Sequence, residues 1–405
     1  MISFNTTIYN MIILKSISMS PILHASSSTS LLIKQTKFSR FFSPLIRNIP
    51  SFLKVYSSSF SHFIEAPIQI RRDEIGLESN SSCYILNNQI IMDKSIQIIS
   101  IPKVIITDST FVNNSRLIGK NIEDCTGGAI FVLGAVQIIL TRCSFQYCMA
   151  INAGAVNLCN SKSNITQCSF NECKSFDNVG ALWSMGFSKN DSECSLFIVE
   201  TNFSKNFAGK NCGALNVNMT NTKIFSCIFD KNIANYSVGA AAIIGEYSTF
   251  LSFVDFIGNN CKDNCAALWL QGNIEYMSNI HKVSLDTVHF LNNNDNVTVD
   301  QFDSEAEKNN QKDTKRSAIH TFGIVSLYFK NEICFDGEYE SFLINHHEEK
   351  IVIQQNFKEV LFKNNSECPI KLRPQTPIVC PEYTYPYVEN MLIKGKLPLY
   401  MPIEF

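Results

Sequence analysis

One short phrase recurs along this chain and constrains its possible folds more than any other feature. Residues 143–156 read CSFQYCMAINAGAV, and residues 168–182 read CSFNECKSFDNVGAL. Aligning the phrase along the chain marks nine phenylalanines: Phe111, Phe145, Phe170, Phe203, Phe229, Phe256, Phe290, Phe335 and Phe362. Four of the eight intervals are 25 to 27 residues long, and the longer ones fit loops inserted into one unit of about 26 residues. A unit of this size cannot bury its own apolar face, so the units must stack.

A pair of small residues keeps step with the phenylalanine. An alanine follows it by 10 or 11 residues in five units, at Ala155, Ala181, Ala214, Ala240 and Ala267. Glycine precedes four of these alanines, where it allows a tight corner without a clash from a Cβ atom. Two landmarks in constant register over five units indicate a structural repeat.

The residues around each phenylalanine alternate with a period of two. Polar residues flank it, as Ser144 and Gln146 flank Phe145, and this pattern predicts a strand with the phenylalanine facing inward. An apolar residue after the alanine predicts a second short strand, and Gly and Asn turns without helical periodicity favour a solenoid. The sequence therefore predicts an all-β fold, a right-handed parallel β-helix (a pectin-lyase-like solenoid) with coils of about 26 residues.

Asparagine stands three residues after the phenylalanine in six of the nine units. These residues are Asn114, Asn206, Asn232, Asn259, Asn293 and Asn365. Stacked side-chain amides bond one coil to the next, and asparagine also tolerates a left-handed turn. We therefore expect a structural role for this row and no catalytic one.

The N-terminal region differs in composition from the repeats. Residues 1–64 contain no Asp or Glu but six Lys or Arg and fifteen Ser. We interpret residues 1–58 as a basic, Ser-rich leader or targeting segment, with the first turns of the fold as the alternative. Phe38 and Phe60 are expected to lie outside the registered units.

The remaining boundaries follow from the repeat and from proline. The β-helix is predicted over residues 59–368, with registered coils over 107–365 and a charged loop insertion at 299–316. Residues 369–405 hold seven of the twelve prolines and are predicted to form a Pro-rich tail. No run of 18 apolar residues occurs, so no transmembrane helix is expected, and a net charge of −2 gives no general attraction to nucleic acid.

Cysteines occupy equivalent positions in neighbouring coils. Cys143 and Cys168 each stand two residues before a phenylalanine, and Cys148 and Cys173 stand three after it. They either form inward rows of small side chains or are joined as Cys143–Cys168 and Cys148–Cys173 disulfides. No cysteine spacing typical of zinc sites occurs, and the sequence predicts no metal and no cofactor.

Asn-x-(Ser/Thr) sequons are slightly more frequent than expected by chance. The candidate N-glycosylation sites within the repeats are Asn164, Asn202, Asn218, Asn235 and Asn296.

The combination of Gly-Gly-Ala-Ile at residues 127–130 with repeated Phe-x-x-Asn resembles the chlamydial polymorphic outer-membrane-protein repeats, which also occur in surface proteins of parasitic flagellates. The resemblance covers roughly residues 107–365, although only residues 127–130 show the complete first motif and Cys148, Cys173 and Glu338 replace the asparagine. It implies an extracellular or cell-surface protein used for adhesion or antigenic display, with an unknown protein or glycan partner.

Some proteins of this architecture are enzymes, so the alternative function is that of a carbohydrate-active polysaccharide lyase or hydrolase. Such enzymes need two carboxyl groups close together in one groove. Here Glu172, Asp230, Asp255 and Asp263 occupy non-equivalent positions in their coils, and we therefore expect no enzymatic activity.

The two tryptophans occupy the same coil position. Trp183 and Trp269 each stand two residues after the repeated alanine, and the insertions 184–194 and 272–282 follow them. Strand alternation predicts that both side chains point outward, where exposed tryptophans can bind a partner. The alternative is that each tryptophan anchors its own inserted loop.

Overall fold

The computed structural model describes most residues of the repeats. These are residues 6–16, 21, 23–24, 30–47, 51–71, 83–86, 89–92, 99–117, 125–186, 194–245, 248–262, 265–272, 281–293, 317–322, 325–336, 341–345, 352–353 and 361–364. The chain divides into two units, Met1–Pro369 and Ile370–Phe405, and every described strand belongs to the first. The predicted tail at 369–405 and the predicted insertion at 299–316 lie outside the described residues.

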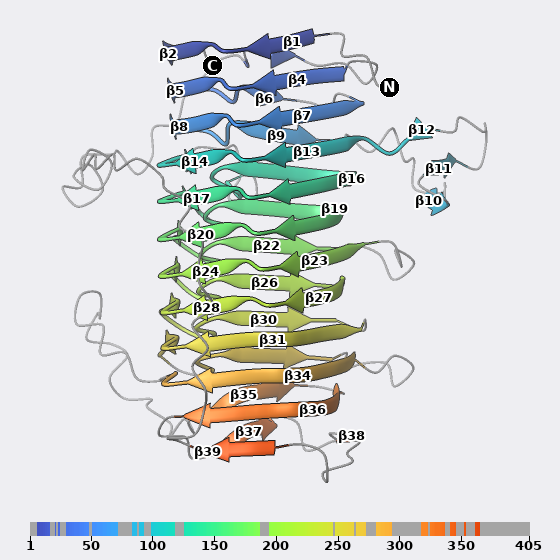
Figure 1. Cartoon of the computed structure of the whole chain (residues 1–405), viewed down its shortest axis with the longest axis vertical. Helices are drawn as coiled ribbons and strands as arrows, with labels where there is room; N and C mark the ends of the chain where they lie inside the picture. The colour runs from blue at the N-terminus through green and yellow to red at the C-terminus, as the bar shows by residue number, and fades with distance from the viewer. Residues whose placement is uncertain are drawn as a thin grey trace, which may run out of the picture. The chain divides into compact units, whose positions relative to one another are not determined.

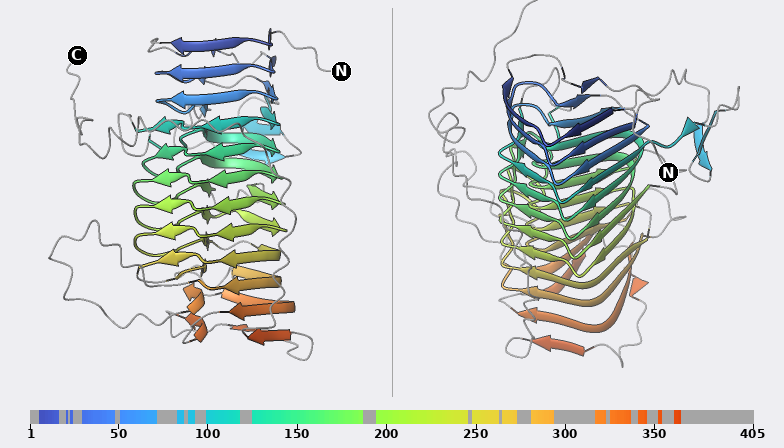
Figure 2. Two further views of the ribbon diagram at one scale, coloured as in Figure 1. Left: turned by 60° about the vertical axis from the view of Figure 1, so that its left-hand side comes forward. Right: turned by 45° about the horizontal axis from the view of Figure 1, so that its top comes forward.

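The first unit is a parallel β-helix solenoid, as predicted (Figure 1). Within the described residues, thirty strands form one continuous sheet, six form a second, and all pairings in both are parallel. The tilted view in Figure 2 shows the strands of successive coils lying over one another. A separate antiparallel sheet contains β10 (Cys83–Leu86), β11 (Gln89–Met92) and β12 (Ile99–Ser100).

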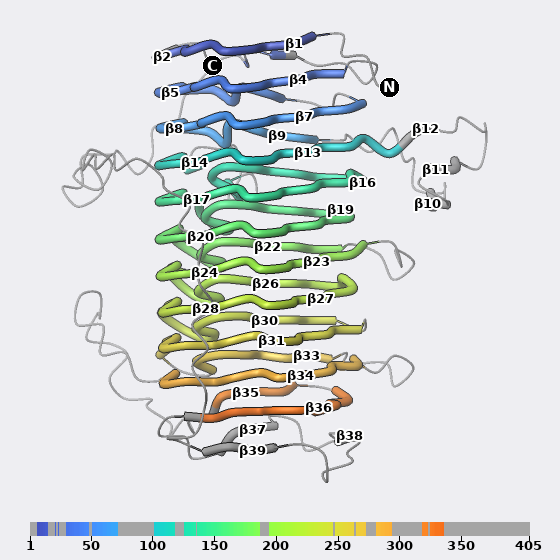
Figure 3. Tube along the Cα trace, viewed as in Figure 1, coloured from blue at the N-terminus to red at the C-terminus, as the bar shows by residue number. Residues whose placement is uncertain are grey.

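Each coil contributes strands to up to four rows, which Figure 3 traces along the backbone. The first row contains β1 (Thr6–Tyr9), β4 (Ser30–Lys34), β7 (Phe52–Tyr56), β13 (Lys103–Thr107), the C-terminal halves of β16 (Ile130–Thr141) and β19 (Val156–Thr166), β23 (Ser195–Val199), β27 (Asn221–Phe225), the N-terminal halves of β31 (Thr249–Ile257), β34 (His281–Leu291) and β36 (Val325–Asp336), and β38 (Val352–Ile353). The second row contains β2 (Ile12–Ser16), β5 (Lys37–Phe41), β8 (Ser59–Phe63), β14 (Thr110–Val112), β17 (Ser144–Gln146), β20 (Ser169–Asn171), β24 (Asn202–Ser204), β28 (Ile228–Asp230), the C-terminal halves of β31, β34 and β36, and β39 (Leu361–Asn364).

The other two rows complete the coil. The third row contains the short strands β15 (Ser115–Arg116), β18 (Met149–Ala150), β21 (Lys174–Ser175), β25 (Phe207–Ala208), β29 (Ile233–Ala234) and β32 (Asn260–Cys261). The fourth row contains β3 (Leu23–His24), β6 (Ile46–Arg47), β9 (Ile68–Arg71), the N-terminal halves of β16 and β19, β22 (Leu182–Met185), β26 (Leu215–Asn218), β30 (Ala241–Ile244), β33 (Leu268–Gln271), β35 (Ser317–Phe322) and β37 (Ser341–Asn345).

Left-handed residues form the corners of the coil. Between the first and second rows, one residue per coil has a φ of 47° to 55°: Asn10, Gln35, Ser57, Asp108, Arg142, Gln167, Glu200, Ser226, Phe253, Thr287 and Asn331. A second set lies between the second and third rows: Asn113, Tyr147, Glu172, Lys205, Lys231, Gly258 and Asn292. Five members of this second set immediately precede an asparagine of the predicted row, and Tyr147 and Glu172 precede Cys148 and Cys173, which replace the asparagine. The asparagine row itself therefore does not supply the left-handed residue.

The phenylalanines form a continuous stack through the core. Phe111 and Phe145 are fully buried, and their ring centroids lie 4.9 Å apart with an interplanar angle of 7°. Equivalent stacking runs on to Phe335. In the last described strand pair, the register places Phe362 opposite Ile333 and Asn364 opposite Phe335. The last predicted repeat is thus wrong by two residues, a shift that preserves the alternation between faces.

The predicted start of the β-helix at residue 59 is also wrong. Strand β4 pairs with β7, and β7 pairs with β13, so the coils begin within the segment interpreted as a leader. Phe38 stacks on Phe60 with centroids 5.5 Å apart, and Phe60 stacks on Phe111 at 4.9 Å.

Glycine before the repeated alanine is required by close packing between coils. A Cβ atom on Gly154 would overlap the carbonyl oxygen of Gly180, and one on Gly180 would overlap that of Gly213. A side chain at these positions would therefore clash, as the sequence predicts, and the atoms it would overlap belong to the neighbouring coil.

Candidate functional site

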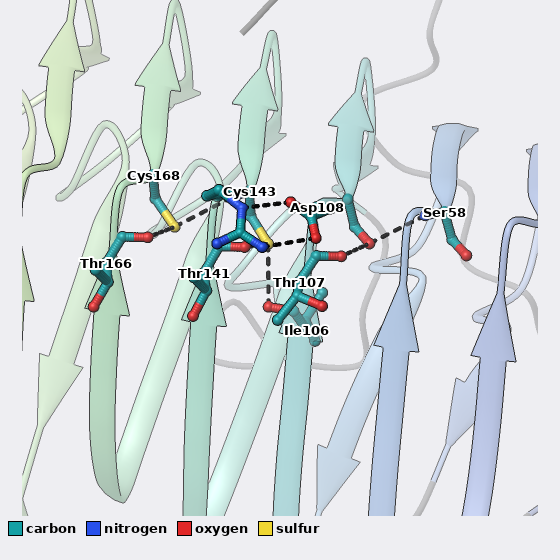
Figure 4. Close-up of polar contacts among 10 residues, drawn as sticks. Ser58, Ile106, Thr107, Asp108, Thr141, Cys143, Thr166 and Cys168 are labelled. Carbon is teal, nitrogen blue, oxygen red and sulfur yellow. Dashed lines mark hydrogen bonds and ion pairs between the residues drawn. The ribbon is translucent and has the colours of Figure 1, made fainter. Parts of the chain in front are cut away.

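A row of hydroxyl and thiol groups runs along the corner between the first and second rows. It occupies the position two residues before each phenylalanine from Phe111 to Phe229, and Figure 4 shows its section around Cys143. The Cys143 thiol donates to the carbonyl oxygens of Ile106, at 3.4 Å, and Thr141, at 3.5 Å. The backbone N–H of Cys143 donates to the sulfur of Cys168, at 3.4 Å. Ser109 has the same role in the preceding coil, since its hydroxyl donates to Thr107 O and accepts from the N–H of Ser58.

The predicted asparagine row forms a second hydrogen-bonded ladder. Asn206 Nδ2 donates to Phe170 O of the preceding coil, at 3.0 Å, and Asn232 Nδ2 donates to Phe203 O, at 2.9 Å. In two coils a cysteine takes over the same contact. The Cys148 thiol donates to Phe111 O, at 3.5 Å, and the Cys173 thiol donates to Phe145 O, at 3.6 Å.

The two suggested disulfides are not formed in the structure. Cys143, Cys148, Cys168 and Cys173 are free, buried thiols. The register does place Cys143 beside Cys168 and Cys148 beside Cys173 in adjacent coils. Their sulfurs instead complete the two hydrogen-bonded ladders, so the structure corresponds to the inward-row alternative.

Burial makes the thiols of Cys159, Cys168, Cys173 and Cys212 poor nucleophiles. Desolvation raises the pKa of Cys168 and of Cys173, and the interaction with the neighbouring thiol, of Cys143 and Cys148 respectively, raises it further. Burial also raises the pKa of Cys159 and of Cys212 to about 12. Because the thiolate is the reactive form, a chemical role for these four cysteines is disfavoured.

Trp183 and Trp269 lie in one column on the outer face of the fourth row. The register pairs Trp183 with Asn216, Asn216 with Ala242, and Ala242 with Trp269. Three coil steps therefore separate the two tryptophans, or about 14 Å at the usual strand spacing. Leu182 belongs to the main core whereas Trp183 does not, so the side chain of Trp183 points outward as alternation predicts.

Both tryptophans are only partly exposed. They pack against a small apolar cluster, separate from the main core, that contains Val179, Cys212, Val238 and Ala242. Trp269 also stacks on His320, with centroids 5.9 Å apart, and its indole N–H donates to Gln271 Oε1 at 3.4 Å. The indole nitrogen of Trp183 is buried without a hydrogen-bond partner. These contacts are compatible with partner binding and with loop anchoring, and residues 187–193 and 273–280 of the insertions lie outside the described residues.

The sequons differ in exposure. Asn164 is exposed on the first row, and its side-chain oxygen accepts a hydrogen bond from Thr166. Asn202, Asn218 and Asn235 are partly buried, with side-chain oxygens that are inaccessible and unpaired. Asn296 lies outside the described residues. Asn164 is therefore the most accessible acceptor among the four that can be assessed.

Two of the four acids considered for an enzyme, Asp230 and Asp255, lie on the second row. Asp255 Oδ1 is 2.8 Å from His289 Nδ1 of the next coil. Asp230 lies in the neighbouring column of the adjacent strand and accepts from Ser204 at 3.4 Å. Glu172 lies at a left-handed corner, and Asp263 is outside the described residues.

Sequence reasoning missed the outer face of the first row. Lysine recurs there, at Lys34, Lys54, Lys103, Lys162, Lys223, Lys282 and Lys330. Aromatic residues accompany it, at Tyr9, Phe52, Tyr56, Phe197, Phe225, Phe250 and Tyr328. The lysines follow no fixed offset from the phenylalanine repeat, so only the strand register reveals that they share a face.

Within the described ranges, no group of three or more His, Cys, Asp or Glu side chains is arranged to hold a metal ion. The same ranges include no helix able to cross a bilayer. No protein-family model, curated protein or solved structure matches this chain.

Proposed function

We propose that this chain is a non-enzymatic β-helix protein, secreted or displayed at a cell surface, that binds a protein or glycan through its outer strand faces. The proposal includes membership of the polymorphic outer-membrane-protein-like repeat class, with adhesion or antigenic display as the role. Support for that class comes from the stacked Phe and Asn ladders, which are the structural counterpart of its Phe-x-x-Asn motif.

The observation that carries the binding role is the outward column joining Trp183 to Trp269. Parallel strands at fixed spacing hold both indoles on one face, so a single ligand can contact both without reorganising the protein. Partly exposed tryptophan is enriched at the centres of binding interfaces.

Replacement of both tryptophans tests this role. The double variant Trp183→Ser/Trp269→Ser is expected to lose attachment to the native host or partner cell while its thermal unfolding midpoint stays nearly unchanged. Phe176→Ser/Tyr236→Ser is the matched control, because these aromatic side chains are 51% and 55% exposed outside this column. A variant that attaches normally but unfolds at lower temperature would show that the tryptophans anchor loops.

Two further measurements address localisation and enzymology. N-terminal sequencing and glycan analysis of protein from its native cell should show an extracellular or surface-exposed glycoprotein, whereas unprocessed, unglycosylated cytosolic protein would contradict the proposal. The alternative of a carbohydrate-active enzyme draws on the Asp255–His289 pair. Release of new sugar ends from a polysaccharide panel, abolished by Asp255→Asn, would favour that alternative.

A further inference from the structure

The outer face of the first row, which we call the lysine face, carries an excess of positive charge. Its outward positions hold seven lysines, and Asp286 is the only acid at the outward positions of the described first-row strands. The whole chain has a net charge of −2, so the excess is local to this face. Lys162, Lys223, Lys282 and Lys330 are exposed. Such a concentration of one sign of charge attracts an oppositely charged partner.

Four of the seven lysines, from Lys103 to Lys282, are spaced regularly along the coils. The others lie on coils adjacent to a lysine-bearing coil: Lys34 on β4, Lys54 on β7 and Lys330 on β36. Lys103 pairs with Gln137, which pairs with Lys162, so these two lysines lie two coils apart. Lys223 lies on β27, two strands beyond Lys162 in the first row. Lys282 lies on β34, two strands beyond Lys223. Four lysines therefore lie on alternate coils, roughly 10 Å apart along the stack at twice the usual strand spacing.

Aromatic rings occupy the coils between the last three of these lysines, whereas the outward residues of the coil between Lys103 and Lys162 are Gln137, Ile139 and Thr141. Phe197 lies on the strand between Lys162 and Lys223, and the register places it directly opposite Lys223. Phe250 is opposite Lys223 from the other side, on the strand that precedes Lys282. The ring of Phe225 joins the two, with centroids 5.5 Å from Phe197 and 5.2 Å from Phe250. Cation and ring thus alternate along the face from Lys162 to Lys282.

We propose that the lysine face binds a linear acidic polysaccharide laid along the coil stack. The carboxylate or sulfate groups of the polymer would pair with Lys162, Lys223 and Lys282, and the apolar C–H faces of its sugar rings would pack on Phe197 and Phe250. A polymer with at least one acidic group per disaccharide can present one to a lysine on every second coil. This inference rests on the proposed binding function and names the ligand class for one face.

A nucleic acid is the less suitable occupant of the same face. Proteins that bind single strands line a groove with closely spaced positive charge, and arginine is the residue best suited to bidentate contacts with phosphate. No arginine occupies an outward position on the described first-row strands, and lysine recurs only on alternate coils between Lys103 and Lys282. An anionic membrane requires no periodic arrangement of charge, and the periodicity therefore favours a regular polymer.

The sequon at Asn164 lies on the same face. Asn164 is two residues beyond Lys162 and pairs with Phe197 in the next coil. A glycan on Asn164 would occupy the space in which the polymer is expected to bind. The binding experiment therefore uses full-length protein carrying Asn164→Gln.

The test measures binding to heparin and to polygalacturonate, with dextran as the uncharged control. The triple variant Lys162→Gln/Lys223→Gln/Lys282→Gln is expected to lower the affinity for both acidic polymers about tenfold, the combined effect of three exposed charge pairs. Lys205→Gln/Lys210→Gln/Lys231→Gln removes the same charge from exposed lysines outside this face and should change the affinity by less than about twofold. Equal losses in the two variants would reduce the effect to net charge and overturn the proposal.

Phe197→Ala separates sugar packing from charge. We expect it to weaken binding to both acidic polysaccharides while leaving the dependence of affinity on salt concentration unchanged. Absence of binding to either polymer would overturn the inference, as would tighter, lysine-dependent binding to oligo(dT) or to phosphatidylserine vesicles. The tryptophan double variant distinguishes the two proposals. If this variant no longer attaches to the partner cell, and the protein with both tryptophans binds neither heparin nor polygalacturonate, the proposed function stands and this inference does not.

Discussion

The side-chain amide of Asn206 donates a hydrogen bond to the side-chain oxygen of Asn232 in the next coil, at 2.9 Å. The backbone N–H of Asn206 donates to the same oxygen at 3.0 Å. Asn232 in turn donates to Phe203 O and to Asn259. One buried side chain thus satisfies polar groups in the coils on both sides of it.

Removal of this side chain should be costly. Asn232→Ala leaves the Phe203 carbonyl and the Asn206 N–H buried without these partners, at about 1 to 3 kcal/mol for each group. We expect the free energy of unfolding, measured in urea, to fall by about 2 to 6 kcal/mol. Asn232→Cys should lose less, because Cys148 and Cys173 make the equivalent contact in other coils. Equal losses for the two variants would contradict the ladder argument.

The phenylalanine stack gives a second prediction. Phe170→Ala should lower the free energy of unfolding by about 3 to 5 kcal/mol, since it removes a fully buried ring from between two others. Phe60→Ala should cost a similar amount, although sequence analysis placed Phe60 outside the repeat. Phe176, which is 51% exposed, supplies the control. A change below about 1 kcal/mol for Phe170→Ala would mean that the register is wrong.

The thiol ladder gives a third prediction. Cys143→Ser should change the free energy of unfolding by less than about 1 kcal/mol, the net value of a typical hydrogen bond, because Ser109 makes the same contact in the preceding coil. Native protein should react slowly with iodoacetamide at Cys168 and Cys173, whose pKa values are raised by burial, and unfolding in urea should expose both. Non-reducing mass spectrometry that finds Cys143 linked to Cys168 would contradict the free-thiol structure.

The core of the solenoid could be predicted from the sequence because stacking demands the same residue type at the same place. Phe145 and Phe170 are 25 residues apart, and their intervening loop is too short to hide the repeat. Phe38 and Phe60 escaped detection because 22 residues separate them, 51 residues separate Phe60 from Phe111, and neither is followed by the Gly-Ala landmark. A sequence with many phenylalanines can also be aligned in more than one way. The repeat aligned Phe362 with Phe335, whereas the strand register pairs Phe362 with Ile333.

The outer faces could not be predicted in the same way. Solvent imposes no stacking rule, so an outward residue varies freely from coil to coil. Lys162 and Lys223 occupy different columns of the first row, and insertions of different length separate their coils. The hydrogen-bonded pairing of the strands shows that the two lysines share a face, and their spacing in the sequence does not.

A buried histidine gives the last prediction. His281 is 1% exposed at the start of β34, with Nδ1 3.1 Å from Gln271 O and Nε2 2.9 Å from Thr249 Oγ1. Because a carbonyl oxygen only accepts, Nδ1 carries the proton and Nε2 accepts from the threonine hydroxyl. Burial lowers the pKa of His281 from 6.5 to about 4, and the hydrogen bond to Gln271 opposes this shift only partly.

This shift should make stability depend on pH in a defined window. Above pH 6.5 His281 is neutral in both the folded and unfolded states, so its contribution is fully present there. As the pH falls from 6.5 toward about 4, the unfolded state takes up the proton first, and stability decreases by roughly 3 kcal/mol. His62, whose pKa is also lowered, chiefly by burial, acts in the same direction. The free energy of unfolding, measured in urea, should therefore differ less between pH 8 and pH 4.5 for His281→Asn than for the natural protein. Acids elsewhere titrate alike in the two proteins and do not affect this comparison. An equal difference in the two proteins would show that the pKa of His281 is not lowered in the folded protein.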